Sequence, residues 1–206
     1  MRSGIRVALE LSFGHLMSHR EQRSVAKQVW KAYSSNRHSF APLDLHLTGL
    51  AQGAKQLDLL QPKAAHWPAW RLPQHTASAR DVWPTSELVW LSPDATEPLL
   101  TLDPHSVYVV GGIVDPHIQP GLTLERAEVE GARARRLPLP EFAPHSSHYV
   151  LSLTSTVELL ASINAGFDWQ EAIQRSQPTW FESCHSRSKA KSRRKQARKA
   201  LWKTDP

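Results

Sequence analysis

Apolar residues recur along the chain with two periods, the alternation typical of strands and the wider spacing typical of helices. Residues 5–13 alternate, with Val7, Leu9 and Leu11 on one face, and predict a strand. Apolar residues at helical spacing predict a helix over residues 19–34. By the same patterns we expect further strands over residues 43–48, 87–91, 106–114, 134–137 and 149–153, and further helices over residues 122–130, 154–164 and 168–175.

Capping residues mark two of the helix starts. Ser18 stands three residues before Glu21, which is the spacing of a capping box. Asp168 precedes the last expected helix and is predicted to be its N-cap. Residues 52–84 show neither period clearly and contain several tryptophans and prolines, so we interpret them as an insertion or linker.

Strands that alternate with helices predict an α/β fold, with a mainly parallel sheet flanked by helices. The chain has 206 residues, 40% of them hydrophobic, which suffices for one domain with its own core. We expect that domain over residues 1–177, followed by a basic tail over residues 178–206.

The excess of positive charge lies at the end of the chain. The formal net charge is +6, and residues 186–206 alone hold nine Lys or Arg and one Asp, a net of +8. This segment has little apolar material to bury and would favour phosphates or an acidic surface. Its composition is equally typical of a solubilising tail or a nuclear-localisation signal.

Several classes of protein and of site are disfavoured. Cys184 is the only cysteine, so no intrachain disulfide can form and multi-cysteine zinc or iron–sulfur sites are excluded. The histidines are dispersed, without a carboxylate or thiol at ligand spacing, and we expect no metal. No apolar run approaches a membrane span, and residues 1–13 are too charged for a secretory signal, so cytoplasmic or nuclear residence, or both, is expected.

The most informative segment covers residues 108–121, Tyr-Val-Val-Gly-Gly-Ile-Val-Asp-Pro-His-Ile-Gln-Pro-Gly. An apolar run enters a glycine pair and stops at the carboxylate of Asp115. In open α/β sheets, ligands bind beyond the carboxyl ends of parallel strands. Asp115 is therefore a candidate general base or ligand-binding group. The alternative is a strand that ends in an aspartate capping the next turn.

The order of these segments resembles the SPOUT-class tRNA methyltransferases that modify the purine at position nine. The resemblance runs collinearly from about residue 5 to residue 173, and its most specific part is Gly-Gly-x-Val-Asp followed by Arg-Leu-Pro-Leu. The matching segments are Val-Ala-Leu-Glu-Leu-Ser-Phe at 7–13, Gln28 with Tyr-Ser-Ser-Asn-Arg at 33–37, Leu-Val-Trp-Leu-Ser-Pro-Asp at 88–94, Tyr-Val-Val-Gly-Gly-Ile-Val-Asp at 108–115, Arg-Leu-Pro-Leu at 136–139 and Asp-Trp-Gln-Glu-Ala at 168–172.

The resemblance implies a SPOUT-like domain with a C-terminal trefoil knot, a topology that sequence patterns would not suggest by themselves. It implies an enzyme that transfers a methyl group from S-adenosylmethionine to the ring nitrogen N1 of guanine at tRNA position nine. It assigns the role of base to Asp115, and it suggests that Gln28 positions the purine and that Arg37 contacts a phosphate. For Gln28 the equal alternative is an ordinary residue on the helix surface. By position, the cofactor-binding residues would be Leu91, Gly112, Pro116, His117, Ile118, Gln119, Pro120, Thr123, Leu137, Val150, Leu151 and Ser152.

Further RNA contacts are expected from the tail, at Arg193, Arg194 and Lys195. We expect a monomer, with a partner subunit left open. Two positions depart from the family pattern, because Glu10 stands where an aspartate is usual and Thr154 where an asparagine is common. The alternative function is a non-catalytic module that binds RNA or a partner and has kept the SPOUT fold.

Overall fold

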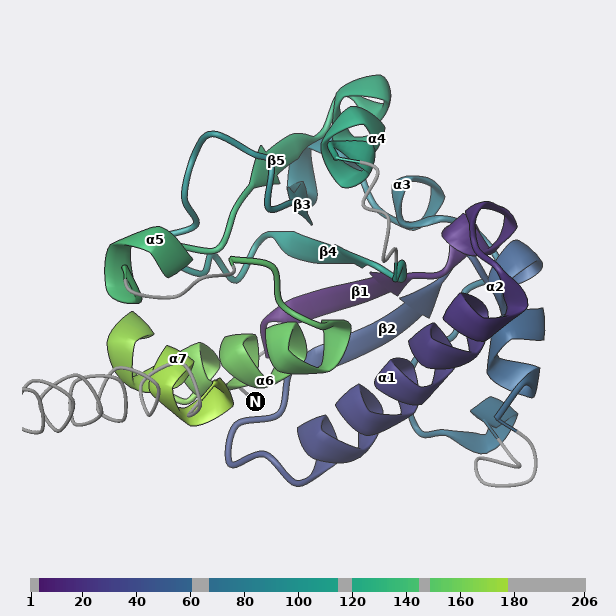
Figure 1. The fold of residues 1–206 in the computed structure, drawn as a ribbon, viewed down its shortest axis with the longest axis horizontal. Coiled ribbons are helices and arrows are strands. Elements are labelled where there is room, and N and C mark those ends of the chain that lie inside the picture. Colours follow the sequence, from purple (N-terminus) through teal and green to yellow (C-terminus); the bar gives the residue numbers. More distant parts are fainter. Residues whose placement is uncertain (1–3, 61–66, 115–119, 145–148, 178–206) are drawn as a thin grey trace, which may run out of the picture.

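The computed structural model describes residues 4–60, 67–114, 120–144 and 149–177. Five strands form one sheet, and all its pairings are parallel. The spatial order of the strands is β2-β1-β4-β3-β5, so β4 is the central strand and β1 and β3 lie on either side of it (Figure 1). The strands are β1 (Arg6–Glu10), β2 (Asp44–Thr48), β3 (Leu88–Leu91), β4 (Val107–Gly111) and β5 (Arg133–Arg135).

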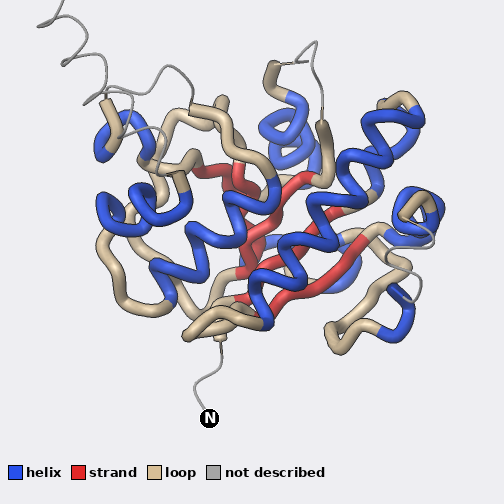
Figure 2. Tube along the Cα trace, turned by 60° about the horizontal axis from the view of Figure 1, so that its bottom comes forward, coloured by secondary structure: helices blue, strands red, loops and turns tan. Residues whose placement is uncertain are grey.

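Helices connect and cover these strands. The long helices α1 and α6 lie side by side across one face of the sheet (Figure 2), and α7 packs on α6. α4 packs against β3 and β5. The α-helices are α1 (His19–Arg37), α2 (Leu50–Asp58), α3 (Ala79–Val82), α4 (Leu122–Glu130), α5 (Leu139–Phe142), α6 (Leu153–Asn164) and α7 (Trp169–Ser176), and the 3₁₀ turns are η1 (Ser12–Leu16), η2 (Trp67–Ala69) and η3 (Thr85–Glu87).

The register aligns the carboxyl ends of the central strands. Glu10, at the end of β1, lies opposite Thr48 of β2 and opposite Gly111 of β4. All four residues of β3, and every residue of β4 except Gly111, are buried. Apolar runs such as these are typical of parallel strands that are covered on both faces. The structure confirms the expected α/β fold with a parallel sheet.

Both capping predictions are confirmed. The Ser18 hydroxyl oxygen accepts from the Glu21 backbone N–H, and the Glu21 carboxylate accepts from the Ser18 backbone N–H, so the capping box is complete. The Asp168 carboxylate accepts from the backbone N–H of Glu171 at 2.8 Å and caps α7. α1 continues three residues beyond the expected end, to Arg37.

The expected strand over residues 149–153 is wrong. Residues 149–152 have no strand pairing, and Tyr149 and Val150 are exposed rather than buried in a sheet. Ser152 is instead the N-cap of α6, which begins at Leu153, one residue earlier than expected. Apolar side chains that line a cavity mimic the composition of a short strand, which explains the error.

The structure resolves much of the segment 52–84 that the sequence pattern left unassigned. α2 contains Gly53, which lowers helix propensity. A Cβ atom at Gly53 would lie 2.4 Å from the Cβ of Leu11, so the glycine allows α2 to pack closely on the end of β1. Residues 73–77 then run beside β2, where the Leu47 backbone bonds to Pro73 and His75. Tertiary packing therefore determines this region more than local periodicity does.

The bounds of two other strands also differ from those expected from the sequence. β4 ends at Gly111, before the expected end at residue 114, and β5 lies at residues 133–135 rather than 134–137. The short helix α5, whose first residues are Leu139 and Pro140, was not expected. No described contact tests the trefoil knot, which stays a prediction.

Candidate functional site

The carboxyl end of β4 approaches β1 very closely. The backbone N–H of Gly112 donates to the Glu10 carbonyl at 2.7 Å. A Cβ atom at position 112 would lie 2.8 Å from that carbonyl oxygen and 2.6 Å from Cδ2 of Leu11. Only glycine fits such a contact without displacing neighbours. This explains one of the two glycines that precede Asp115.

A cavity of about 350 Å³ opens beside this strand end. We call it the strand-end cavity. Its walls come from the ends of β3 and β4, the start of α4, the β5–α5 connection and the segment that leads into α6. The lining is mainly apolar and consists of Leu91, Ser92, Pro93, Asp94, Val110, Gly111, Ile113, Leu122, Thr123, Arg136, Leu137, Pro140, Tyr149, Val150, Leu151, Leu153 and Thr156.

The cavity unites segments that are distant in sequence, and many of the expected cofactor-binding residues are among them. Leu91, Thr123, Leu137, Val150 and Leu151 line it. Gly112, Pro120 and Ser152 are described and are not part of the lining. Asp115, Pro116, His117, Ile118 and Gln119 lie outside the described residues.

Sequence reasoning selected Thr123 but neither of the charged residues of this cavity, Asp94 and Arg136. The Asp94 carboxylate accepts from the backbone N–H of Gly121 at 2.9 Å and thereby ties the loop after β3 to the start of α4. Gly121 has φ of 85°, a conformation that favours glycine. The signal was present in the sequence, because Asp94 follows a buried strand just as Asp115 does.

A second polar group is the ion pair of Arg136 with Glu141. The two guanidinium nitrogens of Arg136 donate to the two carboxylate oxygens of Glu141 at 2.9 and 2.6 Å. This paired hydrogen bond lowers the pKa of Glu141 and raises that of Arg136. The pair spans the Arg-Leu-Pro-Leu motif and α5, and it holds one wall of the cavity in place.

Glu10 points away from the cavity into the protein. Its side chain is fully buried, and its carboxylate accepts from the Thr48 hydroxyl at 2.8 Å, the Ala79 backbone N–H at 2.8 Å and the Ser12 backbone N–H at 3.2 Å. A Cβ atom at Gly49 would lie 2.1 Å from the same carboxylate. Glu10 therefore joins the ends of β1 and β2 to the first residue of α3.

Gln28 forms hydrogen bonds that join α1 to α6. Its side-chain oxygen accepts from the backbone N–H of Leu153 at 2.9 Å, and its backbone carbonyl accepts from the Thr154 hydroxyl at 3.1 Å. The side-chain bond satisfies an N–H group of the first turn of α6, where no intrahelical partner exists. Gln28 thus fixes the segment that forms one wall of the strand-end cavity, and its role toward a purine stays a prediction.

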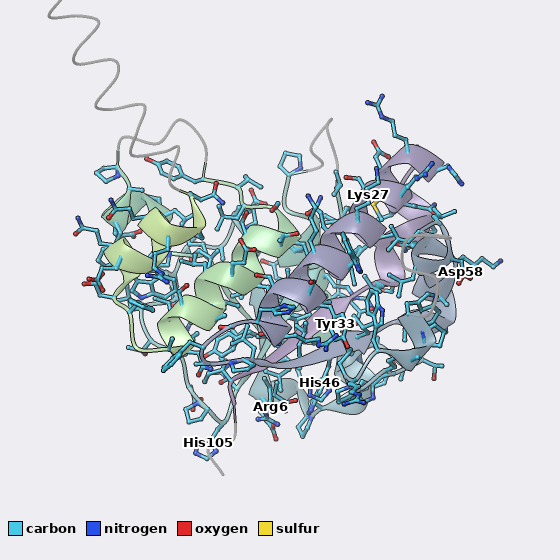
Figure 3. The ribbon with its side chains drawn as sticks, turned by 90° about the horizontal axis from the view of Figure 1, so that it is seen from below. Arg6, Lys27, Tyr33, His46, Asp58 and His105 are labelled. Carbon is cyan, nitrogen blue, oxygen red and sulfur yellow. The ribbon has the colours of Figure 1, made fainter. Side chains whose placement is uncertain are left out.

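The outward side of α1 is strongly basic. Its exposed cations are Arg20, Arg23, Lys27, Lys31 and Arg37 (Figure 3 labels Lys27 on this helix). The one acidic residue of α1, Glu21, is used by the capping box. We call this surface the basic face of α1. The tail residues Arg193, Arg194 and Lys195, for which RNA contact was also predicted, lie outside the described residues.

A larger and more open cavity, about 600 Å³, lies between η1, α2 and α4 and shares Leu122 with the strand-end cavity. Its described lining contains none of the expected cofactor-binding residues. We assign the binding site to the smaller cavity because apolar walls with a few polar groups are typical of cofactor pockets. In the described part of the chain, no three His, Cys, Asp or Glu side chains could hold a metal ion, and no helix is long and apolar enough to cross a membrane.

Comparison with known proteins finds matches over most of the chain. Residues 1–180 match the family model described as tRNA (guanine(9)-N(1))-methyltransferase TRM10/TRM10A. A tRNA (guanine(9)-N1)-methyltransferase of Eremothecium gossypii is 31% identical over 176 residues, which cover 85% of this chain and 59% of the relative. The Drosophila melanogaster protein tRNA (guanine(9)-N(1))-methyltransferase Trmt10A is 33% identical over 86% of this chain and 56% of its own length. The chain thus spans less than two thirds of these relatives.

A solved structure has a similar fold. The crystal structure of full-length spTrm10 in complex with SAH superposes with a TM-score of 0.77 and 26% identity, over 85% of this chain and 94% of that one.

Proposed function

Because the chain belongs to the tRNA (guanine(9)-N(1))-methyltransferase TRM10/TRM10A family, we propose that it methylates N1 of guanine at position nine of tRNA with S-adenosylmethionine as the donor. The observation that carries this proposal is the strand-end cavity. Its volume of about 350 Å³ lies within the usual range for small-molecule sites, and its lining combines apolar walls with a few polar groups. The fold neighbour that carries SAH supports a donor of this class.

The described residues fit such a donor. Leu91, Leu137 and Leu151 would enclose the adenine, and Thr123 offers a hydroxyl at the start of α4. The donor supplies an electrophilic methyl group on its sulfonium. The protein's part is to hold that methyl group in line with the nucleophile and to exclude water, which requires little beyond alignment.

Guanine N1 still carries a proton, so the protein must also accept it. We assign this role to Asp115. The residue lies two positions after Ile113, and its loop leads into Leu122, and both of these line the strand-end cavity. A carboxylate is one of the side-chain groups that act as general bases in such proton transfers.

The basic face of α1 supports tRNA as the partner. It presents five exposed cations on one side of the helix. The helix begins two residues after Met17, whose sulfur accepts from the backbone N–H of Val114 at 3.4 Å, one residue before Asp115 in the sequence. Lys and Arg side chains bind phosphates and provide much of the affinity for nucleic acids. Additional affinity from the tail is part of the same proposal.

The proposal is tested by two separate measurements. Titration with S-adenosylhomocysteine should show saturable binding, and binding should weaken strongly in Leu137→Arg, which places a charge in the apolar wall. Incubation with unmodified tRNA and labelled donor should give 1-methylguanosine. Binding of the donor without methylation of any tRNA would favour the non-catalytic alternative.

A further inference from the structure

The C-terminal half of α1 carries another cavity, separate from the strand-end cavity. A hollow of about 420 Å³ is formed by Trp30, Tyr33 and Arg37 of α1 together with Trp70 and Arg71 of the segment after η2. We call it the α1 hollow. It shares no lining residue with the strand-end cavity. Tyr33, which is labelled in Figure 3, marks the position of the α1 hollow on the helix.

Aromatic rings form a fixed part of this hollow. The rings of Tyr33 and Trp70 are stacked, with centroids 4.7 Å apart and planes 11° apart. The Tyr33 hydroxyl oxygen accepts from the backbone N–H of Arg71 at 3.0 Å. These contacts hold the Trp70–Arg71 segment against α1. Trp30 is 41% exposed, which leaves a large apolar ring surface open to solvent.

The hollow is also positively charged. The guanidinium of Arg37 lies 5.5 Å from the centre of the Tyr33 ring, and Arg71 is exposed. No acidic residue contributes to the lining, and neither arginine forms an ion pair with another described residue. An anion that entered would therefore meet two guanidinium groups without displacing a carboxylate.

The hollow continues the basic face of α1. At 1.5 Å per residue, Trp30 lies roughly 16 Å along the helix from its first residue, His19. Just before the helix, the sulfur of Met17 accepts from the backbone N–H of Val114, one residue before Asp115. Arg23 and Lys27 occupy the exposed surface between these points. A strand of RNA that reaches the strand-end cavity could therefore follow α1 and enter the hollow.

We propose that the α1 hollow binds one unpaired nucleotide of the tRNA, with the base against Trp30 and the phosphate between Arg37 and Arg71. This inference rests on the proposed function, since it takes tRNA as the partner. Exposed aromatic rings beside arginines are the elements with which proteins bind single-stranded RNA, since every base has a face that can stack. An acidic peptide would satisfy the arginines and leave the flat ring surface unused.

The test measures equilibrium binding of unmodified tRNA by the full chain at several salt concentrations. Trp30→Ala should weaken binding about tenfold and leave the slope of log affinity against log salt unchanged, because it removes stacking without removing charge. Arg71→Gln should weaken binding and reduce that slope by about one, because one phosphate contact is lost. Trp30→Phe keeps a ring and should recover most of the affinity.

Phe40→Ala and Arg80→Gln are the matched controls, since both side chains are exposed and neither lines the hollow. Both should bind as the unmodified chain does. If Trp30→Ala and Arg71→Gln bind tRNA as tightly and with the same slope as these controls, the hollow is not a tRNA site. If an acidic peptide competes with tRNA and loses its own binding in Arg71→Gln but not in Trp30→Ala, the assignment to RNA is overturned.

Methylation is measured in parallel, which separates this proposal from the proposed function. A protein that binds tRNA through the hollow and produces no methylated guanosine would contradict the enzyme assignment alone. If Trp30→Ala and Arg71→Gln both methylate tRNA normally, with an unchanged KM for tRNA, the assignment of a nucleotide to the α1 hollow is wrong and the proposed function stands.

Discussion

The side-chain oxygen of Gln28 accepts a hydrogen bond from the backbone N–H of Leu153 at 2.9 Å, and this bond joins the middle of α1 to the first turn of α6. The two residues are separated by most of the chain, and Leu153 lines the strand-end cavity. The residue that the family resemblance assigns to the purine therefore also shapes the wall of the strand-end cavity.

Substitutions at Gln28 can separate these two roles. Gln28→Glu keeps an acceptor for the Leu153 N–H, so the free energy of unfolding should stay close to that of the unmodified chain. Gln28→Ala removes the acceptor and should lower it by about 1 kcal/mol. Urea unfolding measures both, with the exposed Gln170→Ala of α7 as the control.

Methylation kinetics complete this comparison. If the Gln28 amide also positions guanine, Gln28→Glu should lose activity while remaining stable. Full activity in Gln28→Glu would assign the residue to the α1–α6 contact alone.

Glu10 should matter for stability more than for chemistry. Glu10→Ala removes the acceptor of three hydrogen bonds in a fully buried place and should destabilise the fold by on the order of 3 kcal/mol. Glu128→Ala, at an exposed position on α4, should change stability little. Thermal and urea unfolding compare the two. An unfolding free energy for Glu10→Ala equal to that of Glu128→Ala would show that the buried carboxylate is not an anchor.

The two adjacent glycines should respond differently to alanine. Gly112→Ala forces a methyl group against the Glu10 carbonyl and should cost about 1–3 kcal/mol of stability. At Gly111 the added Cβ would lie 2.8 Å from the Thr123 methyl group inside the strand-end cavity, so Gly111→Ala should mainly weaken binding of S-adenosylhomocysteine. Urea unfolding and titration with S-adenosylhomocysteine are measured on both variants. Equal losses of stability and of binding in the two variants would contradict the separate roles of Gly111 and Gly112.

The His46–His75 pair predicts a loss of stability in mild acid. Their ring nitrogens lie 3.1 Å apart, and burial, followed by the charge of His46, lowers the pKa of His75 below 6.5. Below pH 6.5, His75 therefore binds a proton more readily in the unfolded chain than in the folded one. The free energy of unfolding that this residue contributes above pH 6.5 is lost as the pH falls below that value.

The melting temperature as a function of pH checks this expectation. His75→Gln should show a smaller decrease between pH 7.5 and pH 5.5 than the unmodified chain, and the exposed His19→Gln should behave as the unmodified chain does. An equal decrease in all three proteins would exclude His75 as the cause.

The sequence predicts the parts of this fold that local rules determine. The Ser18–Glu21 capping box and the Asp168 N-cap depend on spacing alone, and both are present. α2 was missed because Gly53 is required by the packing of Leu11, a contact between elements that periodicity does not encode.

The strand-end cavity also combines features that the local sequence predicts with features that depend on contacts between distant segments. Leu137 could be assigned by its motif, whereas the Asp94–Gly121 bond depends on how two loops meet in space. The exposed apolar pair Tyr149 and Val150 resembled a strand because the lining of a cavity and the face of a sheet have similar composition.

The most direct test is to map the methylated nucleoside formed on unmodified tRNA by the unmodified chain and by Asp115→Asn, with Asp81→Asn as the control. We predict 1-methylguanosine at position nine for the unmodified chain and for Asp81→Asn. Asp115→Asn should bind S-adenosylhomocysteine normally and methylate 10²- to 10⁴-fold more slowly, in the usual range for loss of a general base. Methylation at another position, or an Asp115→Asn variant that works at full rate, would contradict the account.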